Sequence, residues 1–272
     1  MMYKIFIVAI ALILSVPAFS RSMAIPTGSR AAGMGNAYVS QSGAFSVYHN
    51  PAGTSNIDQI ALSVFYESRF QIEYLSVKAA TATLPTSAGN FSFQFNSFGA
   101  PEWNESNAGI TYALNLSERL SAGLQLHYYG QRLPEANTLV MNAGFETGAI
   151  YQVSERSHMG LSLANFLTPK IRNSEHTSQI PWTIRGGGHT RFASDFIVSY
   201  EAEKIENEKI NFKTGGEWQA SKGFLIRAGF NTAPRKFFAG FGYSNETISF
   251  DIAFSNHYNL GYVTSASITL ML

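Results

Sequence analysis

The sequence of 272 residues contains no cysteine, and this absence excludes several classes of protein at once. A chain without thiols cannot form a disulfide framework, a thiolate zinc site or a lipid-anchored cysteine behind a leader peptide. Charged residues make up only 14% of the chain and the formal net charge is +1, which gives no basic surface for nucleic acid and no acidic tail. We therefore expect no nucleic-acid partner, and stability that comes from packing and backbone pairing.

Long hydrophobic runs are also missing, apart from one at the N-terminus. Residues 1–20 have a basic start at Lys4, an apolar run over residues 5–16 and small residues at the end, which is typical of a secretory signal peptide. That run is too short for a bilayer-spanning helix, and no other stretch approaches the roughly 18 uninterrupted apolar residues that such a helix needs. We predict an exported chain that begins near Arg21 and has no transmembrane helix.

Motifs that carry chemistry are absent as well. The six histidines are scattered, none lies in a His-Glu-x-x-His pattern, and there is no Gly-x-Ser-x-Gly elbow or phosphate-binding loop. His127 and Glu146 are a conceivable acid/base pair across neighbouring strands, but a network of mutually paired lumen groups explains them better. We predict no catalytic residue, no metal, no cofactor and no enzymatic activity.

Alternation of apolar and polar residues is what the chain has in abundance. Hydrophobic residues make up 45% of it, yet the mean hydropathy is −0.02, so the two kinds of residue are finely interleaved. Residues 91–96 read Phe-Ser-Phe-Gln-Phe-Asn, and similar runs recur to the C-terminus. One run is expected to begin at Phe70 and end at Pro85, after a tight connection at residues 67–69. We expect about fourteen strands, each near the 9–11 residues that a tilted strand needs to cross a bilayer.

The connections between these strands alternate in length. One set is short and polar, as at residues 154–157 and 193–195, whereas the other is mostly longer and includes residues 166–181. Outer-membrane barrels have short periplasmic turns, longer outer loops and an even number of strands. The pattern predicts an all-β protein, a transmembrane antiparallel β-barrel of about 14 strands. An exported soluble β-sandwich or barrel also alternates, but here large apolar residues fill nearly every position of one parity on many strands, which argues against it. The predicted lipid-facing band includes Phe93, Leu124, Phe212, Phe241 and Phe250.

The opposite face of the strands is polar and should line the lumen. A barrel of this size is too wide for its wall side chains to fill, so water or a plug must occupy it. We predict that residues 21–56 form the plug and residues 57–272 the barrel. Gly186, Gly187 and Gly188 indicate either close contact with the plug or a bend in the wall. The lumen network is expected to comprise His127, Glu146, Arg185, His189 and Arg227.

Two short motifs define the plug. Residues 28–35 read Gly-Ser-Arg-Ala-Ala-Gly-Met-Gly and residues 50–53 read Asn-Pro-Ala-Gly. Glycine permits positive φ and close backbone approach, and Asn-Pro favours a turn. The expected plug residues are Gly28, Gly33, Gly35, Asn50 and Pro51.

These motifs resemble the N-terminal signature of the PorV/PorQ family, which are FadL-like outer-membrane barrels of type IX secretion in Bacteroidota. The resemblance extends to residues 148–165, 180–187, 227–230 and 240–243. It implies location in the cell outer membrane, in contact with its lipid, and a non-enzymatic role in protein secretion or surface attachment. Partners would then bind the outer loops, chiefly residues 168–180, where apolar residues lie among charged ones.

A second function belongs to a different class. A FadL-like channel would take up hydrophobic small molecules after movement of the plug, and it requires an apolar binding pocket in the lumen. Because the lumen-facing residues are polar and balanced in charge, the sequence alone favours the partner-binding barrel.

Overall fold

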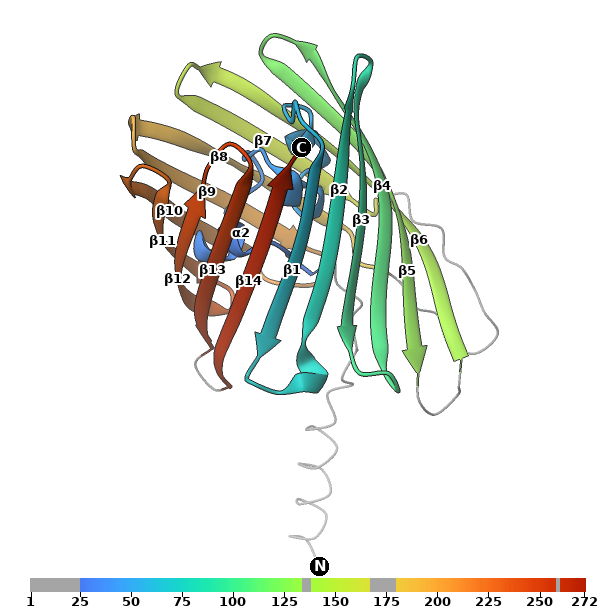
Figure 1. The fold of residues 1–272 in the computed structure, drawn as a ribbon. Helices are drawn as coiled ribbons and strands as arrows, with labels where there is room; N and C mark the ends of the chain where they lie inside the picture. The colour runs from blue at the N-terminus through green and yellow to red at the C-terminus, as the bar shows by residue number, and fades with distance from the viewer. Residues whose placement is uncertain (1–24, 134–137, 167–179, 258–259) are drawn as a thin grey trace, which may run out of the picture.

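The computed structural model describes residues 25–133, 138–166, 180–257 and 260–272. The predicted leader, and all but the last residue of the predicted partner-binding loop 168–180, lie outside these ranges. Fourteen antiparallel strands form one closed barrel, and an irregular N-terminal segment lies inside it (Figure 1). The prediction of a closed antiparallel barrel of about 14 strands is confirmed.

The strands follow one another around the barrel in chain order, and the first pairs with the last. Their bounds are β1 Ala61–Arg69, β2 Val77–Thr86, β3 Gly89–Gly99, β4 Asn104–Ser117, β5 Leu120–Leu133, β6 Thr138–Ser154, β7 Ser157–Ala164, β8 Thr183–Ala193, β9 Phe196–Ile205, β10 Asn211–Ser221, β11 Phe224–Thr232, β12 Arg235–Ser244, β13 Ile248–His257 and β14 Gly261–Met271. Each strand alternates in burial because successive side chains point to opposite faces of the wall.

The two ends of the barrel differ. The connections from β2 to β3, β4 to β5, β6 to β7, β8 to β9 and β10 to β11 have two residues each, and they lie at the end where β14 and the chain finish. Most of the longer connections lie at the opposite end. By the rule for outer-membrane barrels, the short-turn end is periplasmic and the other faces the cell exterior. We call these the periplasmic and the outer end.

The first outer connection differs from the predicted one. Phe70 and Gln71 have φ of 59° and 57°, which ends β1, and a 3-10 turn η3 (Glu73–Leu75) precedes β2. The prediction of a strand from Phe70 was wrong because alternation of Phe70, Ile72 and Tyr74 resembles a strand, whereas Ile72 and Tyr74 are exposed on a loop.

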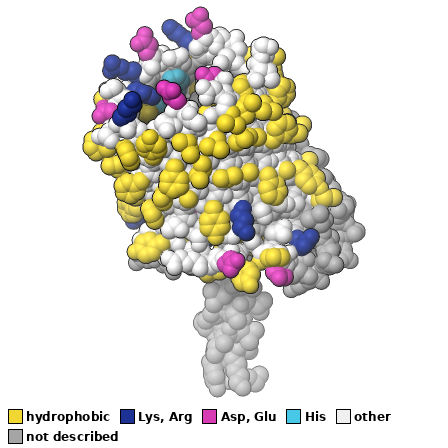
Figure 2. Space-filling view, in the orientation of Figure 1, with side chains coloured by type: hydrophobic (Ala, Val, Ile, Leu, Met, Phe, Trp, Pro, Cys, Tyr) yellow, Lys and Arg dark blue, Asp and Glu magenta, His cyan; other side chains and the backbone are white. Residues whose placement is uncertain are grey.

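The outward face of the wall is apolar. Hydrophobic side chains cover the view of β14 and β1 to β4, and charged side chains gather toward the ends (Figure 2). The five predicted lipid-facing residues all point outward and are 40–58% exposed, namely Phe93, Leu124, Phe212, Phe241 and Phe250. Among the described residues, no helix is long and apolar enough to cross a membrane.

An arginine on this face should destabilise the barrel. Phe241 lies within β12, between Ile226 and Ile252 on the neighbouring strands. We expect Phe241→Arg to lower the free energy of unfolding by about 2–4 kcal/mol, because a lipid-facing charge is costly near the bilayer midplane. Urea titration in phospholipid vesicles measures this. Leu84→Arg, on the outward face near the periplasmic end of β2 and 39% exposed, is the control and should cost about 0–1 kcal/mol; equal losses in the two variants would contradict a membrane-spanning wall.

Candidate functional site

The segment over residues 25–60 fills much of the lumen. It contains a one-turn helix α2 (Ser29–Gly33) and the 3-10 turns η1 (Ala44–Tyr48) and η2 (Pro51–Thr54). Most of its side chains are buried, and many of the polar ones, such as Ser29 and Asn50, are bonded to the wall or to other residues of the segment. The segment lies inside the wall, and the first barrel strand begins at Ala61, four residues after the predicted boundary. We call this segment the plug.

Glycines of the plug allow its sharp turns. Gly28 has a φ of 110° and Gly35 a φ of 64°, backbone conformations that residues other than glycine rarely adopt. Gly33 lies against the wall, where an added Cβ would come within 3.3 Å of Arg227 Cβ. The motif therefore serves close packing of the plug against the wall.

Glycines of the wall complete this fit. Added Cβ atoms at Gly215 and Gly229 would collide with the backbone of Met34 and Gly35, and one at Gly123 would lie 2.5 Å from Ala52 N. Gly187 is different, since its Cβ would meet Tyr200 and Glu201 of the neighbouring strand. At Gly187 the absent side chain therefore makes room first for the neighbouring strand, whereas its cross-strand partner Gly160 faces Val39 and Ser40 of the plug.

Asn50 anchors the second motif. Its Nδ2 donates to Val39 O within the plug at 2.7 Å and to Ala149 O of the wall at 3.2 Å, while its Oδ1 accepts from Ala52 N at 3.0 Å. The last bond caps η2, with Pro51 in its first turn. One side chain thus shapes the plug and joins it to β6.

His49 is another buried polar residue of the plug. Its Nε2 lies 3.0 Å from Thr27 O, so Nε2 must carry the proton and donate. Burial, together with the charge of Arg185, lowers the pKa of His49 to about 3. The ring is therefore neutral at physiological pH and links two distant parts of the plug.

An ionic cluster near α2 bonds the plug to the wall. Arg30 of the plug donates to both oxygens of Glu217, at 2.7 and 2.8 Å, and Arg227 donates to the same carboxylate at 2.6 Å. Asp251 lies 2.8 Å from Arg227. Two guanidinium groups and two carboxylates balance one another in the lumen.

A second cluster holds the middle of the plug. Oε2 of Glu201 accepts hydrogen bonds from Tyr38 N at 3.0 Å and Val39 N at 2.9 Å. The other oxygen of Glu201 accepts from Lys213 at 2.8 Å, and Lys213 lies 3.0 Å from Glu203. The carboxylate thereby binds two consecutive backbone amides of the plug.

The predicted lumen network is divided in the structure. His127, Glu146 and Arg185 lie together, with Glu146 3.4 Å from the histidine and 3.3 Å from the arginine. His189 lies elsewhere, bonded to Ser40 of the plug at 3.0 Å, and Arg227 belongs to the cluster near α2. Arg185 also donates to His49 O at 3.5 Å, so it too contacts the plug.

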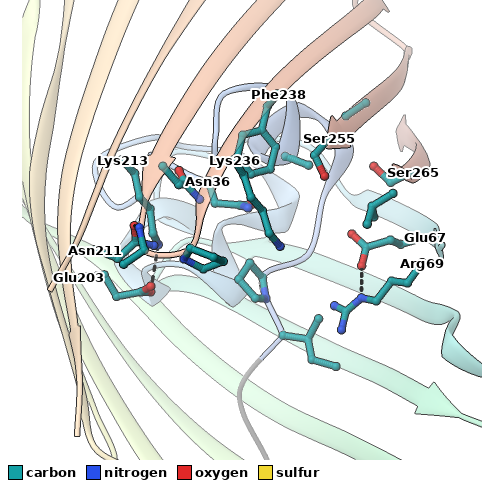
Figure 3. A pocket seen from close by; sticks show the side chains of 18 of the residues that line it. Asn36, Glu67, Arg69, Glu203, Asn211, Lys213, Lys236, Phe238, Ser255 and Ser265 are labelled. Carbon is teal, nitrogen blue, oxygen red and sulfur yellow. Dashed lines mark hydrogen bonds and ion pairs between the residues drawn. The ribbon is translucent and has the colours of Figure 1, made fainter. Parts of the chain in front are cut away.

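A cavity of about 390 Å³ lies between the plug and the outer end of the barrel (Figure 3). We call it the outer vestibule. Its apolar lining residues include Ile25, Pro26, Phe238 and Val263. Its charged lining residues are spread around the cavity: Lys213 lies at one side, the ion pair of Arg69 with Glu67 lies at the other, and Lys236 lies between them beside Phe238 (Figure 3). In the ion pair, Arg69 Nε and Glu67 Oε1 are 2.6 Å apart.

Lys236 is the notable cation of the vestibule. It is half-buried and forms no ion pair with any residue that the structure describes. Sequence reasoning missed Lys236 and Phe238, because neither belongs to a motif and the cavity forms only when the ends of several strands meet. The one available signal was Phe238 itself, an aromatic residue on the lumen-facing parity of β12.

Comparisons with solved structures identify this architecture. The toluene transporter TodX of Pseudomonas putida superposes with a TM-score of 0.66 at 9% identity, covering 92% of this chain and 98% of that one. A FadL homologue of Pseudomonas aeruginosa superposes with a TM-score of 0.60 at 14% identity, covering 91% of this chain and 99% of that one. The fold is that of a FadL-like barrel.

Omp33 of Acinetobacter baumannii, another outer-membrane protein, gives a TM-score of 0.54 at 9% identity and covers 80% of this chain and 100% of that one. No family model and no curated protein matches the sequence. The FadL-like fold and the apolar outward face of the wall agree with each other. The chain is a transmembrane barrel of the bacterial outer membrane. Within the described part of the chain, no three His, Asp or Glu residues form a group that could hold a metal.

Proposed function

We propose that this FadL-like barrel is a channel for the uptake of hydrophobic small molecules. The observation that carries the proposal is the outer vestibule, which joins apolar residues to an ammonium group that has no ion-pair partner among the described residues, on the outer side of the plug. Apolar lining with a few placed polar groups is typical of small-molecule sites. The fold adds support, since TodX, a toluene transporter, shares it.

The plug determines what the channel needs in order to conduct. Its backbone touches the wall at several glycines, and Arg30 and Tyr38 are bonded to buried wall carboxylates. A ligand in the vestibule therefore meets the plug before it can reach the periplasmic end. Passage requires the plug to move, so the vestibule is the loading site and the plug is the gate.

The preferred ligand is apolar with one anionic end. Phe238 and Ile25 offer apolar surface, and Lys236 offers a positive charge for a carboxylate or a similar group. Neutral hydrophobic molecules would contact only the apolar residues of the vestibule. This selectivity is proposed from the charge and shape of the cavity.

The resemblance to PorV/PorQ names a second candidate, a barrel that binds partners in protein secretion or surface attachment. Two observations favour it: the resemblance in residues 28–35 and 50–53, and the close packing of the plug against the wall, which suits a structural partner as well as a gated channel. Its proposed surface, residues 168–180, lies almost entirely outside the described residues. Deletion of residues 170–178 would abolish partner retention under this hypothesis and leave uptake unchanged under the channel hypothesis.

Binding of two fluorescent probes tests the vestibule. We expect Phe238→Ala to weaken both the anionic cis-parinaric acid and the neutral N-phenylnaphthylamine by roughly 5–30-fold, because apolar contact is lost. Lys236→Gln should weaken only the anionic probe, by about fivefold. Phe237→Ala is the matched control, since Phe237 is the next residue but points outward and is 66% exposed. Equal affinities in all variants would contradict the vestibule as a binding site.

A further inference from the structure

A groove of about 460 Å³ runs along the outward face of the barrel, where β14, β1, β2 and β3 lie side by side. Its floor is made by two alanines of β2, Ala80 and Ala82. The strand register places larger residues beside each of them. The two rows across the wall are Ile268, Val64, Ala80 and Phe95, then Leu270, Leu62, Ala82 and Phe93.

A cation lies at the outer end of this groove. Lys78 is two residues before Ala80 on β2, points outward and is exposed. Within the part of the chain that the structure describes, Lys78 forms no ion pair and no side-chain hydrogen bond. A lipid-facing charge without a partner is costly unless it reaches the headgroup region.

The surrounding residues place Lys78 at the membrane boundary. Its cross-strand neighbour is Tyr66, and Tyr262 and Tyr74 are exposed at the same outer end of β14 and in η3. Tyrosines of this kind form the girdles that mark the interface between lipid and water. The ammonium group of Lys78 therefore lies at headgroup level, and the groove extends from it toward the bilayer centre.

The floor of the groove is fixed from inside the barrel. The hydroxyl of Tyr48, a buried residue of the plug, donates to Ala80 O at 3.2 Å and to Phe95 O at 2.9 Å. These bonds hold β2 and β3 together behind the two alanines. The groove is thus a depression in a closed wall, and its floor is supported from inside while the plug is in place.

We propose that this groove binds one phosphorylated glycolipid of the outer leaflet, with its phosphate on Lys78 and an acyl chain on Ala80 and Ala82. The outer end of the barrel faces the outer leaflet, whose characteristic lipid is lipid A, and a phosphate is the complementary charge for a lysine at headgroup level. Small residues between larger ones fit a chain of methylene groups. The site is independent of the vestibule, which lies inside the barrel.

Native mass spectrometry of the folded barrel in detergent, with lipid A added, tests this site. We expect Lys78→Gln, which removes the charge, and Ala80→Phe, which fills the groove, each to retain at most a third of the lipid A retained by the wild type. Lys78→Arg should retain it. The matched controls are Lys222→Gln, at a periplasmic turn, and Ala239→Phe, at a lipid-facing alanine of β12 outside the groove; both should match the wild type.

Several results would overturn the proposal. Undiminished lipid A on Lys78→Gln or on Ala80→Phe would do so, as would an equal loss in the two control variants. Equal retention of phosphatidylglycerol or phosphatidylcholine by the wild type would reject a glycolipid site. Heat-modifiable migration on a gel verifies that each variant is folded, so that loss of lipid is not loss of the barrel.

Discussion

We expect uptake of N-phenylnaphthylamine to stop when the plug is covalently joined to the wall. The hydroxyls of Ser29 in α2 and Ser265 in β14 are 3.1 Å apart and buried. Cysteines at these two positions would therefore lie close enough to form a disulfide. The chain has no other cysteine, so the oxidised double variant carries a single crosslink between plug and barrel.

The measurement is probe uptake by cells whose only copy of the protein is the Ser29→Cys/Ser265→Cys variant, before and after a reductant. Uptake should be lost on oxidation and return on reduction. Ser63→Cys/Thr269→Cys is the matched control, because those hydroxyls are 2.8 Å apart but join β1 to β14 and leave the plug free. Undiminished uptake through the oxidised plug variant would show that the plug does not need to move.

Removal of the carboxylate of Glu217 should cause the largest loss of stability. Glu217 accepts hydrogen bonds from Arg30 and Arg227, and the side chain of Arg227 is fully buried. Glu217→Ala leaves Arg30 without its partner and Arg227 with Asp251 alone. Breaking a buried ion pair from one side costs about 3–5 kcal/mol, since a charge remains in a poorly solvated site.

Urea unfolding of the barrel in phospholipid vesicles gives this free energy. Two controls accompany it. Glu118→Ala, at an exposed periplasmic turn, should change stability by less than about 0.5 kcal/mol. The double variant Arg30→Met/Glu217→Met removes charge from both partners and should be more stable than Glu217→Ala. A loss below about 1 kcal/mol in Glu217→Ala would mean that the cluster does not hold the plug in place.

The wall of the barrel is largely specified by local sequence pattern. Alternation assigns each side chain to one of two faces, and it correctly predicts that Phe241 points outward and Arg227 inward. The same pattern fails at Phe70, because alternation of apolar residues cannot reveal that positive φ at Phe70 and Gln71 turns the chain out of the strand.

The plug shows the limit of motif reasoning. The glycines and Asn50 indicate a tightly packed irregular segment, but not the wall residues that receive it. Gly148 faces Asn50 and Gly229 faces Gly35 across long separations in sequence. The sequence of one chain contains no signal for such a match, because the partner glycines sit in strands that would alternate equally well without them.

Residue period, turn chemistry and length are therefore enough to predict the barrel, its two faces and the segment inside it. Of the charged contacts they indicate only the pair of His127 with Glu146, and the other ion pairs and the positions of the cavities became apparent from the folded chain. Arg30 and Glu217 are 187 residues apart in the sequence. The groove next to Lys78 is lined in part by Ile268 and Leu270 of β14, at the other end of the chain. Turns between neighbouring strands set the register of those pairs, whereas β1 and β14 are not joined by a turn and find their register only when the barrel closes.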